Sequence, residues 1–185
     1  TMLRQGVIAI LAALATCACA GANARPAVAP ASPTITLSII GTNDLHGGIL
    51  ARGDRGGLAL LGSYVANVRA ARARDGGGAL LIDAGDMFQG TLESNLNEGA
   101  SVINAYNGLG YAAAAVGNHD FDFGPVGPPA TPQHQDEDPR GALKARAAQA
   151  SFPFLAANLI DTNTNRPVDW PDVRPLTMVS AAGLR

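Results

Sequence analysis

Three short groups of polar residues in this chain can carry out metal and acid–base chemistry, and each group follows an apolar run. They are Asp44-Leu45-His46, Gly85-Asp86 and Gly117-Asn118-His119-Asp120. Carboxylate, amide and imidazole ligands without a thiolate suit Mn, Zn or Fe better than a soft metal. The groups therefore predict a centre for two divalent metal ions, which would acidify a bound water and orient a phosphate ester for in-line attack.

The residue types suggest how two ions would share these ligands. Asp44 and His46 can hold one ion, and the two carboxylate oxygens of Asp86 can bridge both ions. Asn118 can bind the second ion through its amide oxygen. We expect these four side chains to form the metal site.

Two further residues are candidates for the catalytic step. His119 follows Asn118 directly and need not bind metal, so it can protonate or polarise the leaving oxygen. Asp122 lies three residues later and can fix the tautomer of His119 and raise its pKa. Asn158 has two open interpretations: it caps a strand end, or it supports the metal ligands or the substrate. We expect Asp83 to be structural or to support the metal ligands, and not to bind metal itself.

The apolar periodicity predicts an α/β fold. Runs that are typical of buried strands and runs with helical spacing alternate along the chain, which indicates a mostly parallel sheet with crossover helices. The candidate ligands would then lie beyond the carboxyl ends of neighbouring strands, where open α/β sheets bind ligands. The expected strands are 35–40, 79–82, 112–116, 154–157 and 174–180; the expected helices are 57–74, 95–109 and 141–150; and 160–172 is expected to be loop.

A polar, Pro-rich segment at about 125–140 interrupts this pattern and predicts a surface insertion. It contains His134 and the acidic run Asp136-Glu137-Asp138. We expect these side chains to be solvated and to take no part in the metal site.

The N-terminal region predicts export. Residues 1–24 resemble a secretory signal peptide, since Arg4 precedes a short apolar run and Ala22-Asn23-Ala24 is a small-x-small cleavage site. Residues 25–33 form a Pro/Ala linker. We expect a periplasmic or secreted protein, and the alternative is a lipoprotein anchored through Cys17. Apart from the signal peptide or such an anchor, no membrane contact is expected.

Composition narrows the class of protein further. The chain has 185 residues, of which 47% are hydrophobic, so residues 34–185 suffice for one domain or part of one. The formal net charge is −2, which gives no basic field to attract a nucleic acid polymer. The expected partner is a small-molecule substrate, and the oligomeric state is left open.

Taken together, the motifs resemble the calcineurin-like metallophosphoesterases, and within them the secreted 5′-nucleotidase and 2′,3′-cyclic-nucleotide 2′-phosphodiesterase family, which includes periplasmic UDP-sugar hydrolases. The matching stretches run from about Ile35 to the chain end. They are Thr42-Asn43-Asp44-Leu45-His46-Gly47, Gly56-Gly57-Leu58-Ala59, Asp83-Ala84-Gly85-Asp86, Gln89-Gly90, Gly117-Asn118-His119-Asp120-Phe121-Asp122 and Leu155-Ala156-Ala157-Asn158. In this family a Glu usually stands where the chain has Asp120.

The resemblance implies a four-layer αββα domain and the hydrolysis of phosphate esters of extracytoplasmic nucleotides by a two-metal-activated water. It implies first-metal ligands at Asp44 and His46, a bridging ligand at Asp86, a second-metal ligand at Asn118, and a catalytic dyad of His119 and Asp122. The family completes its site with further His and Gln ligands that would lie beyond residue 185, and it adds a C-terminal nucleotide-binding domain. Residues 34–185 are thus expected to be the N-terminal part of the domain, truncated at the C-terminus, and the chain to be an incomplete and inactive fragment.

Two alternatives to nucleotide hydrolysis stay open at this stage. The thiosulfohydrolases of sulfur-oxidising systems resemble the family in their N-terminal domain. A non-catalytic exported domain that binds a metal or another ligand would explain the missing ligands, but it would have no need for His119 and Asp122.

Overall fold

The computed structural model describes residues 34–185, of which Ile35–Arg185 form one compact unit. The predicted signal peptide, the Pro/Ala linker and Cys17 lie outside the described residues. Between residues 34 and 185, no helix is both long enough and apolar enough to cross a bilayer.

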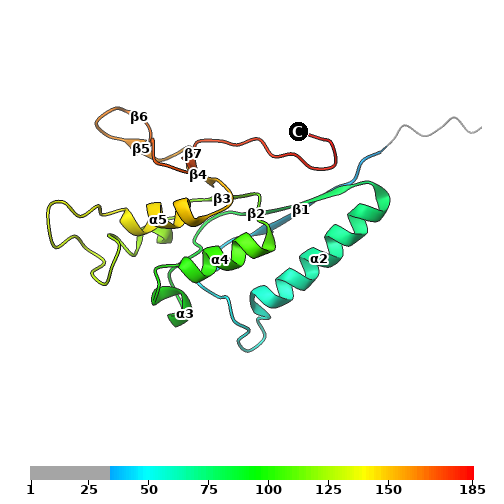
Figure 1. Ribbon diagram of the computed structural model, residues 1–185, viewed down its shortest axis with the longest axis horizontal. Helices are drawn as coiled ribbons and strands as arrows, with labels where there is room; N and C mark the ends of the chain where they lie inside the picture. Colours follow the sequence, from blue (N-terminus) through cyan, green and yellow to red (C-terminus); the bar gives the residue numbers. More distant parts are fainter. Residues whose placement is uncertain (1–33) are drawn as a thin grey trace, which may run out of the picture. The chain divides into compact units, whose positions relative to one another are not determined.

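The centre of the fold is a five-stranded, fully parallel sheet with the strand order β1-β2-β3-β4-β7 (Figure 1). β1 and β2 form the longest pairing, with Leu37 opposite Gly78 and Thr42 opposite Asp83. The parallel order confirms the predicted α/β class with crossover connections. The strands are β1 (Leu37–Thr42), β2 (Gly78–Asp83), β3 (Ala113–Ala115), β4 (Phe154–Leu155) and β7 (Val173–Arg174).

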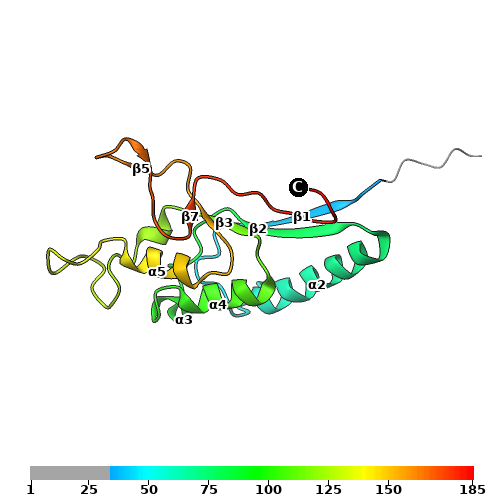
Figure 2. The same cartoon turned by 45° about the horizontal axis from the view of Figure 1, so that its top comes forward.

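The helices lie against one face of this sheet, as Figure 2 shows for α2, α4 and α5. They are α2 (Gly57–Asp75), α3 (Leu92–Asn95), α4 (Ala100–Leu109), the single 3₁₀ turn η1 (His119–Phe121) and α5 (Gly141–Gln149). Of the expected four-layer arrangement, residues 34–185 thus supply one sheet and one helical layer.

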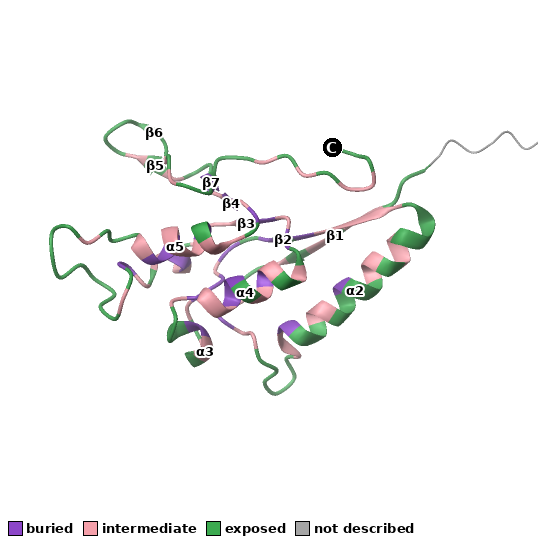
Figure 3. Cartoon of the chain, viewed as in Figure 1, coloured by how far each residue is buried: buried purple, intermediate pink, exposed green. Residues whose placement is uncertain are grey.

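The hydrophobic core lies between the sheet and these helices, and the buried positions in Figure 3 follow that boundary. On β2, Leu81 is 1% exposed, whereas the next residue, Ile82, faces the other side and is 36% exposed. On β1, Ile39 is 65% exposed. The strand expected at 35–40 is present as β1, but its predicted burial was wrong, because β1 is the edge strand and, within residues 34–185, one face of the sheet has no helical cover. The core cluster includes Leu58, Val65, Leu81, Phe88, Val102, Ile103, Tyr106, Leu143 and Phe154.

The helix expected over 95–109 is broken at Gly99. This residue has φ +82°, and a Cβ added there would lie 2.5 Å from the ring of Phe88. Such a position favours glycine and interrupts a helix. The segment therefore forms a short α3 and a separate α4.

The C-terminal third differs from the prediction in two places. The expected loop at 160–172 contains a small antiparallel hairpin, β5 (Ile160–Asp161) with β6 (Arg166–Pro167), and Asp161 Oδ1 accepts hydrogen bonds from the backbone N–H groups of its turn. The strand expected at 174–180 extends only over Val173–Arg174. Pro175 follows it directly and has no N–H to donate to a ladder.

A buried hydrogen-bond network beneath the sheet holds the end of β2. Asp83 is 5% exposed, and its Oδ2 accepts hydrogen bonds from Thr42 Oγ1 at 2.6 Å and from the hydroxyl of Tyr106 at 2.8 Å. Its Oδ1 accepts the Gly85 N–H at 2.7 Å. Tyr106 stacks on Tyr111 with ring centroids 3.8 Å apart. Burial raises the pKa of Asp83. The network is consistent with a structural role for this residue.

We expect Tyr106→Phe to lower the free energy of unfolding by about 1–2 kcal/mol, because it removes a buried donor from the Asp83 carboxylate. Tyr64→Phe is the matched control, since Tyr64 is 57% exposed, and it should change the value by less than about 0.5 kcal/mol. Urea denaturation followed by circular dichroism measures both. Equal effects of the two substitutions would contradict the structural role of the network.

Candidate metal centre

The loops that follow β1 and β2 are held together by backbone hydrogen bonds that continue the ladder of the two strands. The Asp44 N–H donates to the Gly85 carbonyl at 3.0 Å, and the His46 N–H donates to the Asp86 carbonyl at 3.0 Å. Because parallel strands end at the same edge of the sheet, this pairing brings the candidate ligands of both loops to one place.

The side chains of Asp44, His46 and Asp86 form a cluster in which one ligand atom of each lies within 4.8 Å of the others. Asp44 Oδ1 is 3.8 Å from His46 Nε2. All three residues have positive φ, between 47° and 60°, which is uncommon for residues other than glycine. Such backbone positions cost about 1–3 kcal/mol each and persist where the surrounding structure imposes them, typically at functional sites.

The imidazole of His46 is held in an orientation that would allow it to bind a metal ion. Its Nδ1 lies 2.9 Å from the carbonyl oxygen of Gln89, which can only accept, so Nδ1 carries the proton and donates it. Nε2, the nitrogen that remains available to bind a metal ion, faces Asp44. A backbone carbonyl on the far nitrogen is the usual support of a ligating histidine, and two carboxylates with one such imidazole fit a divalent Mn, Zn or Fe ion.

Asp86 connects this cluster to the loop after β3. Its Oδ1 accepts the His119 N–H at 2.9 Å. A Cβ added to Gly117 would lie 2.2 Å from the same oxygen, so only glycine allows this close approach.

Asp120 is a buried residue whose role the sequence did not reveal. It is 1% exposed, and its carboxylate accepts three backbone N–H groups: those of Gly117 at 2.8 Å, Met87 at 2.8 Å and Asp86 at 3.2 Å. Burial raises the pKa of Asp120 to about 6, and the three N–H donors act in the opposite direction. The Asp120 side chain thus connects the loop after β2 to the loop after β3 through hydrogen bonds.

His119 and Asp122 form the pair that the sequence predicts. His119 Nδ1 lies 2.7 Å from Asp122 Oδ2, and this hydrogen bond raises the pKa of His119. The imidazole of His119 meets that of His46 edge to face, with ring centroids 5.2 Å apart. The structure therefore brings His119 beside the carboxylate–imidazole cluster, with the bond to Asp122 on its Nδ1.

The two candidate asparagines are less closely tied to the cluster. Asn118 is exposed and immediately precedes His119, whose N–H binds Asp86. Asn158 is exposed in the turn after β4, which pairs with β3. Within residues 34–185, neither side-chain amide makes a hydrogen bond. His134 lies exposed in the segment between η1 and α5.

The acidic run in the same segment lies at the surface, as expected, with Asp136 and Asp138 exposed. Asp138 accepts the backbone N–H of Arg140 and pairs with Lys144 Nζ at 2.7 Å, so it anchors the segment to the start of α5.

Comparison with curated proteins gives matches over most of the chain. It is 34% identical over 173 residues to protein UshA of Salmonella pullorum, and the match covers 91% of this chain and 28% of that protein. It is 32% identical over 178 residues to a 5′-nucleotidase of Vibrio cholerae, with 91% of this chain and 29% of that protein covered. The chain spans less than a third of the length of these relatives. No protein-family model matches it.

Solved structures share the fold. The 5′-nucleotidase precursor from Thermus thermophilus aligns with a TM-score of 0.58 at 30% identity, over 80% of this chain and 26% of that one. The sulfate thiohydrolase SoxB from the same organism aligns with a TM-score of 0.58 at 16% identity, over 76% of this chain and 33% of that one, which shows the fold alone. The fold and the order of the site residues define a metallophosphoesterase domain. More narrowly, the chain belongs to the 5′-nucleotidase family, of which it represents the N-terminal part.

We expect Asp120→Ala to lower the free energy of unfolding by about 2–4 kcal/mol, because it leaves three backbone N–H groups without their acceptor. The free energy of unfolding of Asp120→Asn should lie between those of Asp120→Ala and the unaltered protein. The amide oxygen of the asparagine can still accept a hydrogen bond, but its NH₂ group faces a backbone N–H. Urea denaturation provides the measurement.

Asp122→Ala is the matched control for this prediction. Asp122 is two residues away, and the side-chain bond that it makes is to the partly exposed His119. We expect its removal to change stability by less than about 0.5 kcal/mol. A loss in Asp120→Ala no larger than in Asp122→Ala would show that the two loops do not depend on the Asp120 carboxylate.

Proposed function

We propose that the protein hydrolyses phosphate esters of extracytoplasmic nucleotides, as a 5′-nucleotidase or a 2′,3′-cyclic-nucleotide phosphodiesterase, at a centre of two divalent ions. The observation that carries this proposal is the position of His119. It is held by Asp122 and lies beside the cluster of Asp44, His46 and Asp86. A domain that only bound metal would have no use for an oriented acid–base pair next to its ligands.

The proposed metal ligands are Asp44 and His46 for one ion, Asp86 for both, and Asn118 for the second. When bound, the ions would lower the pKa of a water and neutralise charge on the phosphate. Four side chains are few for two ions, since catalytic zinc takes about three protein ligands per ion. We therefore propose that residues 34–185 bind metal weakly and turn over substrate slowly without further ligands.

The residues of the chain itself would supply the proton for the leaving group. Asp122 keeps His119 Nδ1 protonated, and the raised pKa of His119 favours the doubly protonated ring that can donate from Nε2. Asn158 follows the neighbouring strand β4 and is a candidate contact to the ligands or the substrate. The proposed location outside the cytoplasm depends on the predicted signal peptide at residues 1–24.

Metal binding tests the proposed ligands without requiring turnover. We expect His46→Ala and Asp86→Asn each to weaken Mn²⁺ or Zn²⁺ binding at least about tenfold, since the first removes a ligand and the second removes the charge and one oxygen of the bridging carboxylate. Isothermal titration calorimetry measures the affinity. His134→Ala is the matched control, because this exposed histidine lies outside the cluster, and it should bind metal as the unaltered protein does. Equal affinity in all three variants would place the metal elsewhere.

Turnover tests the proposed acid–base pair. We expect His119→Ala to lower kcat about 10²–10⁴-fold for phosphate release from 5′-AMP or 2′,3′-cyclic AMP, with metal affinity retained. Asp122→Asn should cause a smaller loss, and His134→Ala should cause none. The assay uses the 185-residue chain and a version that continues to the stop codon of the gene.

The two versions separate the remaining possibilities. Activity only in the longer version, lost in His119→Ala, would support the proposal and the need for further ligands. Full activity in residues 1–185 would refute that need. Absence of activity in both versions, with metal still bound, would favour the non-catalytic binding domain.

A further inference from the structure

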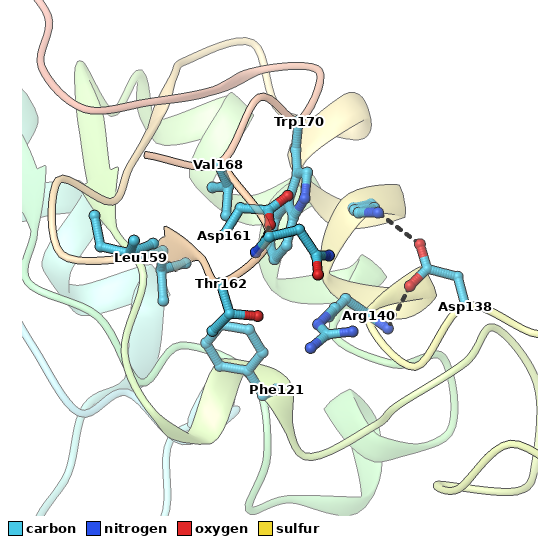
Figure 4. A pocket seen from close by; sticks show the side chains of 11 residues that line it. Phe121, Asp138, Arg140, Leu159, Asp161, Thr162, Val168 and Trp170 are labelled. Atoms are coloured by element: carbon cyan, nitrogen blue, oxygen red, sulfur yellow. Dashed lines mark hydrogen bonds and ion pairs between the residues drawn. The ribbon is translucent and has the colours of Figure 1, made fainter. Parts of the chain in front are cut away.

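A cavity of about 310 Å³ lies between η1, the start of α5 and the β5–β6 hairpin (Figure 4). The side chains that line it are different from those of the metal cluster. Its volume is at the lower end of the range for small-molecule sites in proteins. The cavity is therefore large enough to hold a ligand of its own.

One part of the cavity wall is apolar and aromatic. It includes Phe121, Leu159, Val168 and Trp170, which all pack against the hydrophobic core cluster. Lys144 Nζ lies 4.8 Å from the centroid of the Trp170 ring. Such a wall suits a flat, largely apolar ring.

The two carboxylates of the cavity are already engaged within the chain. Asp138 Oδ2 pairs with Lys144 Nζ at 2.7 Å, and its Oδ1 accepts the Arg140 N–H at 2.9 Å. Asp161 Oδ1 accepts the Asn163 N–H at 2.7 Å. Lys144 holds the pKa of Asp138 below its usual range, so this carboxylate stays ionised and paired. Both oxygens of Asp138 are therefore engaged, whereas Asp161 is engaged through Oδ1.

Three other donors of the cavity are less engaged than Lys144, although the charge of Arg140 also helps to lower the pKa of Asp138. Within residues 34–185, the guanidinium of Arg140, the hydroxyl of Thr162 and the side-chain amide of Asn163 make no hydrogen bond or ion pair. In Figure 4 the Arg140 side chain points across the pocket toward Thr162 and Phe121. A guanidinium binds a carboxylate or phosphate through two parallel hydrogen bonds. This excess of donors suits a ligand that is rich in acceptors and negatively charged.

We propose that this pocket binds a planar aromatic anion, with its ring against the wall of Phe121 and Trp170 and its anionic group on Arg140. Among aromatic anions, a nucleoside monophosphate is the member tested first, and this choice rests on the proposed function. The pocket is a second ligand site on the chain, because none of its residues belongs to the metal cluster.

The fluorescence of Trp170 provides the test, since it is the sole tryptophan of the chain. AMP, adenosine and inorganic phosphate are titrated in the presence of a chelator, with excitation where adenine does not absorb. AMP should change the emission and bind at least about tenfold more tightly than adenosine or phosphate, because it alone supplies both ring and anion. Arg140→Ala should remove the preference of AMP over adenosine, and Arg140→Lys should restore part of it.

Arg74→Ala is the matched control, because Arg74 is an exposed arginine in the last turn of α2, away from the pocket. It should bind AMP as the unaltered protein does. His46→Ala should also leave AMP binding intact. AMP binding that survives in Arg140→Ala but is lost in His46→Ala would overturn the pocket and place the bound AMP at the cluster of Asp44, His46 and Asp86. No change in Trp170 emission, or equal affinity for AMP and adenosine, would also overturn it.

Discussion

The carboxylate of Asp120 is the contact on which the geometry of the candidate metal centre depends. It is buried, and it satisfies three backbone N–H groups from two different loops. Leaving even one of these donors without a partner inside the protein would cost about 1–3 kcal/mol. The loop that carries Asp86 and the loop that carries His119 are therefore fixed to each other before any metal binds.

Around this contact, two of the candidate ligands, His46 and Asp86, are held by backbone groups of neighbouring residues. Gln89 orients the ring of His46, and the N–H of His119 binds Asp86. Beneath the sheet, Asp83 accepts the N–H of Gly85 and so supports the same loop from the core. Part of the folding free energy is thus used to keep Asp44, His46 and Asp86 at positive φ, which is consistent with a site that is organised before it binds.

The polar segment between η1 and α5 connects the two sites described above. It follows directly from the turn that carries His119, and it ends where Asp138 pairs with Lys144 at the rim of the aromatic pocket. Phe121 belongs to η1 and to the pocket wall. A ligand in the pocket would therefore contact the same short turn that positions the proposed general acid.

The sequence by itself determined the parallel α/β order and the residues that meet at the strand ends, because apolar periodicity and motif spacing are local properties of the chain. It also paired His119 with Asp122, which are three residues apart. It did not determine the role of Asp120, since the three N–H groups that this carboxylate binds come from positions up to 34 residues away. The break at Gly99 depended on the ring of Phe88, and the exposure of Ile39 depended on β1 being the edge of the sheet. The aromatic pocket likewise exists only where α5 meets the hairpin. These features were decided by tertiary packing, because each one depends on contacts between elements that the chain brings together only when it folds.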